Sequence, residues 1–331
     1  MRNSIKYHVF QSAQRGMSLV ELMIAMVIGL FLTVGVFTMF SMSSSNVTTT
    51  SQFNQLQENG RIALAIIERD ISQLGFMGDI TGSDLVIGSN TKIDAGSAVS
   101  GVDCIGEGLN NASLPANQPA HFRRLWGYES VDTTKFTCLA SSAVKTKTDV
   151  LQIKRLVGPS VAAGNGRNYF VTATSSQAIF FNTVTPATAL TNARIWEYQH
   201  HVYFLADDAA GVPSLRRKTL TATGMTNDEQ LVEGIENIRF LYGVDDDGDR
   251  TPDRYLPAAN VESKMWDNES FQRLVAIKVF ILVRSVQEDR TYSNDVTYQL
   301  GDKTIEPLKD NYRRKVMSTT IILENPVLSR S

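Results

Sequence analysis

The stretch Arg15-Gly16-Met17-Ser18-Leu19-Val20-Glu21 is followed by Leu22–Phe40, a run of 19 residues without any charge. As a helix this run spans about 28 Å, close to the roughly 30 Å hydrocarbon core of a bilayer. The basic residues that precede it are Arg2, Lys6 and Arg15, and residues 1–16 contain no acidic residue. The positive-inside rule therefore places the N-terminus in the cytoplasm and sends the rest of the chain outward.

Glu21 is unusual because a carboxylate at the start of a membrane segment costs up to ~3 kcal/mol on insertion scales. No charged residue follows it before Glu58, so no Lys or Arg lies within helical reach on that side. A cut after Gly16 would create an α-amino group on Met17. Met17 and Glu21 are i,i+4 neighbours in a helix, and the same amine on one helix can also meet Glu21 of an adjacent one.

Gly16 followed by Met17, with Glu21 at the fifth position of an apolar helix, resembles the class III signal of type IV pilins and pseudopilins. The resemblance implies that prepilin peptidase removes residues 1–16 and N-methylates Met17. It also implies that Glu21 sets the register in which the helices pack. Met17 stands where Phe is more usual, and Thr38 stands where major pilins often have a helix-bending proline.

Two other interpretations of this segment compete with the pilin signal. A secretory signal peptide has a shorter apolar core and a small-x-small cleavage site after it, for which Ser41-x-Ser43 is a poor match. An ordinary single-span anchor would require neither Gly16 nor Glu21.

Residues 17–40 are thus the expected membrane and assembly half of a long helix, and residues 41–77 its amphipathic continuation. Apolar residues recur at helical spacing there: Phe53, Leu56, Ala63, Ile67, Ile71 and Leu74. Gly60 is a weak point inside this segment, and Gly75 and Gly78 are expected to end it. The alternative is two helices with a break at Ser41–Ser51, a stretch rich in Ser and Thr.

Residues 78–331 are expected to form a globular, β-rich periplasmic domain. Runs of β-branched and aromatic residues predict strands over 149–156, 169–172, 178–181, 195–205, 238–242, 274–283 and 315–323. Asp79–Gln118 is rich in Gly, Ser and Asn and predicts long loops. The predicted fold is α+β and pilin-like, with a long N-terminal α-helix packed on an antiparallel β-sheet domain.

Cys104 and Cys138 are the two cysteines of the chain. Because the domain is expected in an oxidising space, a disulfide is predicted; the alternative is two buried free thiols. No Cys-x-x-Cys pair supports redox catalysis or zinc binding. His200 and His201 are adjacent in a predicted strand, so their side chains should point to opposite faces. The spacing of residues supports no catalytic site, and we predict that the chain is not an enzyme.

An acidic loop reads Gly243-Val-Asp-Asp-Asp-Gly-Asp-Arg-Thr-Pro-Asp253. Alternate residues of a tight loop can converge on one Ca²⁺, which takes six to eight oxygen ligands. The candidate ligands are Asp245, Asp247, Asp249, the carbonyl of Thr251, and Asp253. The loop lacks the glycine and glutamate of an EF-hand and looks more like the loops of thrombospondin type 3 repeats. The alternative is a solvated acidic turn without an ion.

Three segments, Leu231–Ile235, Tyr242–Asp245 and Leu323–Asn325, resemble the PilW-type minor pilins. The resemblance implies a structural role in priming type IV pilus assembly, and so in twitching motility, within a complex of minor pilins at the fibre tip. The implied partners are other minor pilins, the major pilin and prepilin peptidase. The protein would lie in the bacterial inner membrane before assembly and in the pilus afterwards.

Other functions weighed against this one are a minor pseudopilin of a type II secretion system, a calcium-dependent pilus-tip adhesin, and a membrane-anchored enzyme. The pseudopilin shares the whole N-terminal pattern. A nucleic-acid partner is disfavoured because the net charge is −2, whereas nucleic-acid binding requires a basic surface.

Overall fold

The computed structural model of the chain describes residues 16–325, except 81–83, 132–133 and 268. Contacts divide the chain into two compact units, residues 1–51 and 52–331, which are described separately. Helix α1 (Leu19–Ser72) contributes to both units. Its backbone is helical through residues 41–51, so the alternative of two helices with a break there is wrong.

In the first unit, the polar side chains within the apolar part of α1 bond to the helix itself. The Thr33 hydroxyl donates to the Gly29 carbonyl at 2.5 Å, and the Thr38 hydroxyl donates to the Gly35 carbonyl at 2.8 Å. Such bonds to the preceding turn satisfy a hydroxyl without water. The threonines therefore do not interrupt a segment that is otherwise apolar.

The larger sheet of the second unit has eight strands, with the order β1–β5–β4–β6–β3–β2 and with β7 pairing both β6 and β8. The pairing of β1 with β5 is parallel and all the others are antiparallel. The strands are β1 (Thr91–Ile93), β2 (Leu125–Ser130), β3 (Thr148–Val161), β4 (Tyr169–Ala173), β5 (Ala178–Phe181), β6 (Arg194–Asp207), β7 (Pro213–Thr219) and β8 (Glu229–Glu233).

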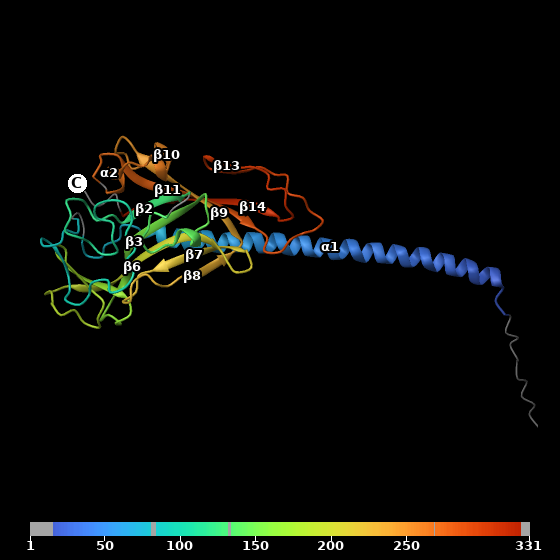
Figure 1. Ribbon diagram of the computed structural model, residues 1–331, viewed down its shortest axis with the longest axis horizontal. Coiled ribbons are helices and arrows are strands. Elements are labelled where there is room, and N and C mark those ends of the chain that lie inside the picture. Colours follow the sequence, from blue (N-terminus) through green and yellow to red (C-terminus); the bar gives the residue numbers. More distant parts are fainter. Residues whose placement is uncertain (1–15, 81–83, 132–133, 268, 326–331) are drawn as a thin grey trace, which may run out of the picture. The chain divides into compact units, whose positions relative to one another are not determined.

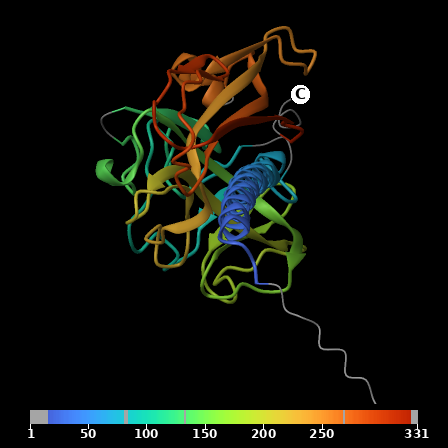
Figure 2. The same ribbon diagram turned by 90° about the vertical axis from the view of Figure 1, so that its right-hand side faces the viewer.

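A second, antiparallel sheet has the order β10–β9–β11–β14. Its strands are β9 (Ile235–Asp245), β10 (Arg254–Pro257), β11 (Arg273–Arg284) and β14 (Arg314–Ile322), and β12 (Tyr298–Leu300) pairs with β13 (Lys303–Ile305) in a separate hairpin. Short helices are η1 (Ser141–Ala143), η2 (Ala258–Asn260) and α2 (Ser263–Trp266). In Figures 1 and 2 the orange-to-red strands lie on one side of this unit and the yellow-green strands on the other.

The structure confirms the α+β class and all seven predicted strands, which correspond to β3, β4, β5, β6, β9, β11 and β14; the last prediction extends one residue beyond the end of β14. The strands that the sequence did not predict are mostly short. Strand β7 was missed for another reason, because Arg216, Arg217 and Lys218 give it the composition of a solvated loop. Between residues 79 and 118, β1 is the one strand in the described part, as expected for long loops.

The part of α1 that belongs to the second unit packs with its predicted apolar stripe inward. Leu56, Ala63, Ile67 and Ile71 are buried in the main core, whereas Phe53 is 38% exposed. Gly60 is buried, and a Cβ atom there would collide with the sulfur of Met317 on β14. The glycine that weakens the helix therefore lets it approach the second sheet closely.

Helix α1 ends at Ser72, before the end of the segment 41–77 that was expected to continue it. Gly75 and Gly78 follow with φ of 79° and 64°, in the left-handed region that glycine adopts readily. A side chain at residue 78 would also meet the indole of Trp196. These two glycines therefore take the chain away from the helix, as predicted.

A buried polar cluster fixes the end of α1 against the larger sheet. The Asp70 carboxylate accepts hydrogen bonds from Arg155 Nη2 at 2.5 Å and from the Tyr203 hydroxyl, and lies 2.5 Å from His201 Nδ1. Burial opposes ionisation of this carboxyl. The hydrogen bond from His201 and the nearby Arg155 charge outweigh burial and hold the pKa of Asp70 well below its usual range.

His200 and His201 point to opposite faces of β6, as predicted. His201 meets Asp70 of α1, whereas His200 Nδ1 lies 2.9 Å from the Ser113 hydroxyl in the loop on the other side. The pKa of His200 is well below its usual value because the ring is fully buried. It is therefore neutral at physiological pH.

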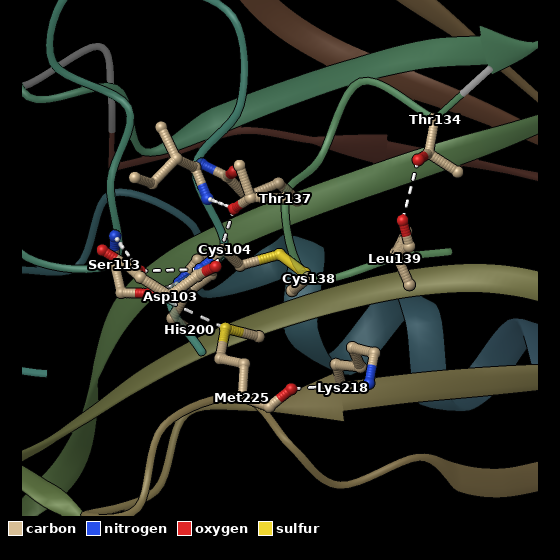
Figure 3. Close-up of a disulfide and its surroundings, with 12 residues drawn as sticks. Asp103, Cys104, Ser113, Thr134, Thr137, Cys138, Leu139, His200, Lys218 and Met225 are labelled. Carbon is tan, nitrogen blue, oxygen red and sulfur yellow. Dashed lines mark hydrogen bonds between the residues drawn. A yellow bond between two sulfur atoms is a disulfide. The ribbon is translucent and has the colours of Figure 1, made fainter. Parts of the chain in front are cut away.

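The predicted disulfide between Cys104 and Cys138 is present and joins two loops beside His200 and Ser113 (Figure 3). The Thr137 hydroxyl donates to the Asp103 carbonyl at 2.7 Å and accepts from the Ile105 amide at 2.8 Å. Covalent and hydrogen bonds together hold this loop pair. The disulfide closes a long segment that has little regular structure of its own.

Arg239 connects the two sheets. Its Nη1 donates to Asp149 Oδ1 of β3 at 3.0 Å, and its Nε and Nη2 donate to Asp302 at 2.8 and 2.7 Å. The Phe240 amide donates to the other Asp149 oxygen at 2.8 Å. The second sheet is thus tied to the first by a buried carboxylate as well as by apolar packing.

Replacing Asp70 by alanine should lower the free energy of unfolding by about 3–5 kcal/mol, because buried Arg155 loses its counter-charge. Urea unfolding of the intact chain in detergent, followed by tryptophan fluorescence, measures the change. The effect should be complete above pH 3.8 and shrink as the pH falls below it, because the folded-state pKa of Asp70 is lowered.

The matched control is Glu68→Ala, which removes an exposed carboxylate from the same helix turn. It should change the free energy of unfolding by about 0.5 kcal/mol or less. Equal losses in the two variants would show that the buried cluster does not stabilise this part of the fold.

Candidate functional site

The expected cleavage site, Gly16–Met17, lies before the first helical residue and is exposed. The Met17 side chain is 68% exposed, and nothing in the described residues lies within 4 Å of a Cβ placed at Gly16. A peptide bond in such a place is open to a peptidase.

The side chains of Ser18 and Glu21 each accept a backbone amide at the start of α1. The Ser18 amide donates to Glu21 Oε2 at 3.0 Å, and the Val20 amide donates to the Ser18 hydroxyl at 3.3 Å. The Ser18 hydroxyl thus caps the helix through the Val20 amide, and the Glu21 carboxylate supplies the return bond of a capping box to the Ser18 amide. In the uncut chain Met17 has no α-amino group, so the Ser18 amide is the partner of the Glu21 carboxylate.

The helical segment Leu19–Ser43 follows directly, with a mean hydropathy of 2.5. Among the described residues it is the one helix that is long and apolar enough to cross a membrane, judged by length and composition. Its large apolar side chains are exposed within the first unit. Glu21 therefore stands at the first turn of a segment that suits membrane anchoring.

Asp245 organises the acidic loop at the end of β9. It is buried, and its carboxylate accepts from the amides of Gly248 at 2.7 Å and Arg250 at 2.9 Å. Gly248 and Arg250 have φ of 88° and 71°, so the chain turns sharply around the carboxylate. Hydrogen bonds between the Asp245 carboxylate and the loop's own backbone amides therefore hold the turn.

Three of the predicted ligands come together in this loop. Oxygen atoms of Asp245, Asp247 and Asp253 lie within 4.8 Å of one another, and this is the one such acidic or histidine-containing group among the described residues. Asp249 lies outside the group, because its carboxylate accepts from the Thr251 amide at 2.7 Å and hydroxyl at 2.6 Å. These bonds lower the pKa of Asp249. The cluster of three carboxylates could hold a metal ion.

Asp246 is not one of the three clustered carboxylates, and it joins the acidic loop to Arg254 and Gln272. Its carboxylate forms an ion pair with Arg254 at 2.8 Å and accepts from Gln272 Nε2 at 2.5 Å. The Asp246 amide donates to Asp253 Oδ2 at 2.7 Å. Asp246 thus helps to position Asp253, a contact that the alternation of acidic residues does not predict.

Two functional contacts were missed at the sequence level. Ser18 was not singled out, although Ser-x-x-Glu before an apolar run is the known signature of a capping box. The contact from Gln272 to Asp246 joins residues 26 positions apart and has no local sequence signal.

Comparison with protein families gives two matches. Residues 11–37 match the Prokaryotic N-terminal methylation motif, and residues 202–325 match the family described as Type IV Pilus-assembly protein W. Comparison with curated proteins and with solved structures gives no significant match. The first match contains Gly16, Met17 and Glu21, and the second contains the whole second sheet and the acidic loop. The two matches support a type IV pilin-like protein of the PilW type.

Proposed function

We propose that the protein is a minor pilin that primes type IV pilus assembly within a complex of minor pilins at the fibre tip. The observation that carries this proposal is the order of features in one chain. An exposed Gly16–Met17 bond precedes a membrane-length helix, and a PilW-type domain follows it. Its role is structural, as expected for a pilus component.

In this proposal, residues 1–16 are the leader that prepilin peptidase removes, and Met17 is then N-methylated. Residues 17–40 hold the protein in the inner membrane as a single span with its N-terminus in the cytoplasm. During assembly the new Met17 amine of one subunit pairs with Glu21 of another, which sets the register of the helices. Residues 41–77 continue the helix, and residues 78–331 form the periplasmic domain.

The main competing proposal is a minor pseudopilin of a type II secretion system, which has the same N-terminal features. Genes for the secretion system next to this one would favour that role. A pilus-tip adhesin is a second alternative, and calcium-dependent binding of the domain to a surface ligand would favour it. Co-purification with other minor pilins from the same operon would favour the priming complex.

We also propose that the acidic loop binds one Ca²⁺. Asp245, Asp247 and Asp253 would supply the first carboxylate oxygens, and Asp249 and the Thr251 carbonyl could join them. Bringing several carboxylates together costs free energy because like charges repel, and a bound cation removes this repulsion. The hydrogen bonds that hold Asp245 leave the loop already turned around the site.

Gly16→Ala should leave the leader uncut, because the peptidase that recognises this signal is expected to require glycine before the scissile bond. The measurement is the intact mass after co-expression with prepilin peptidase. Gly29→Ala is the matched control, because Gly29 also has open space around its Cβ position but lies within the helix. Normal processing of the Gly16 variant would refute the assigned cleavage site.

Glu21→Ala should still be cut but should assemble poorly, because the Met17 amine of the neighbouring subunit would then face no carboxylate. Pilus number on the cell surface and incorporation into sheared fibres measure assembly. Glu58→Ala, which removes the next charge along α1, should assemble normally. Wild-type piliation by the Glu21 variant would remove its proposed role in registration.

Calcium should bind the intact chain in detergent with a heat that calorimetry detects at millimolar Ca²⁺. Asp247→Asn should weaken the affinity about tenfold or more, because one charged ligand is lost. Asp247 suits this test because it is exposed and accepts one backbone bond, from the Asp249 amide. The exposed Asp295→Asn is the control, and the absence of any heat in the wild type would contradict the proposal.

A further inference from the structure

The hydrogen bonds made by the side chains of Ser18 and Glu21 fix the residue at which α1 begins. The first backbone bond of the helix runs from the Leu22 amide to the Ser18 carbonyl, at 3.1 Å. The Ser18 hydroxyl accepts the Val20 amide, and the Glu21 carboxylate accepts the Ser18 amide. Ser18 is therefore the N-cap residue, and the backbone before it is not helical.

This position of the cap leaves the scissile bond outside the helix by two residues. Among the described residues, no backbone amide donates to the carbonyl of Gly16 or Met17. In a helix each carbonyl accepts the amide four residues later, so these two carbonyls would be occupied if α1 started earlier. A peptidase that binds its substrate as an extended segment pairs with free backbone groups of this kind.

We propose that Ser18 is a positioning residue for processing, which stops α1 so that the Gly16–Met17 bond remains extended and open to the peptidase. The inference rests on the proposed cut between these two residues. Ser18 acts through the backbone conformation of Met17 and is not itself required to touch the peptidase.

The residues next to Ser18 favour extension of the helix past this position. Met17 and several of the residues Leu19–Ala25 are good helix formers. Without an N-cap, the helix can extend so that the Met17 carbonyl accepts the Glu21 amide. Alanine at residue 18 would favour this extension twice, because it removes the cap and has the highest helix propensity.

The test measures kcat/KM for cleavage of the full-length precursor in detergent by prepilin peptidase, followed by the mass loss of residues 1–16. Ser18→Ala should be cut about fivefold more slowly, the factor that corresponds to a cap of about 1 kcal/mol. Ser18→Asn should be cut as fast as the wild type, and Ser18→Thr and Ser18→Gly nearly as fast. Ser43→Ala makes the same change at another serine of α1 and should have no effect.

The glycine variant separates capping from recognition of the side chain. Glycine is smaller than alanine but is a far better N-cap, so rates that follow side-chain size instead of cap strength would overturn the proposal. A second readout is the ¹³Cα chemical shift of Met17 in the uncut precursor, assigned with Met17→Leu. It should move toward helical values in Ser18→Ala and stay unchanged in Ser18→Gly.

The outcomes for cleavage and for capping can be told apart. If the wild-type precursor is not cut after Gly16, the proposed processing fails, and the role of Ser18 fails with it. If the wild type is cut and Ser18→Ala is cut equally fast, the processing stands and the positioning role of Ser18 is overturned.

Discussion

The fold of the second unit depends on how α1 packs against the two sheets. The apolar stripe of α1 supplies the buried area, but an apolar stripe alone tolerates small rotations of a helix. Asp70 removes that freedom, because its carboxylate is satisfied only where it reaches Arg155, His201 and Tyr203 together. A rotation by one residue, about 100°, would bury the charge of Arg69 in its place without a partner. The polar cluster therefore selects the orientation that the apolar residues stabilise.

Two different environments shape the two parts of the same helix. Between Glu21 and Glu58 the chain has no charged residue, whereas later turns carry charges on the exposed side. In the apolar part, Thr33 and Thr38 bond to their own helix, as polar groups must where water is absent. In the later part Gly60 has a low helix propensity, but its missing side chain allows the close contact with Met317. A few residues thus adapt the same helix to an apolar segment in one part and to close packing on a sheet in the other.

The sequence predicts best where one residue pattern has one structural meaning. Alternating or continuous apolar runs located β3, β6, β9 and β11, and the export argument located the Cys104–Cys138 disulfide. Prediction failed where tertiary contacts decide. The charged residues of β7 are stabilised as a strand by pairing with β6 and β8. No local pattern distinguishes Asp70 from the other polar residues beside the apolar stripe. At the helix start, Ser18 had a readable local signal that was overlooked.

The acidic loop shows why regular spacing is only part of a binding site. Five ligands were predicted at alternate positions, but the left-handed residues Gly248 and Arg250 bend the chain so that three carboxylates converge. Asp249 instead bonds the amide and hydroxyl of Thr251. A bound cation would have to compete with these two hydrogen bonds, each of which contributes on the order of 1 kcal/mol, to recruit that carboxylate. Affinity in this loop should therefore depend first on Asp245, Asp247 and Asp253, and the contribution of Asp249 should be reduced by the bonds it must give up.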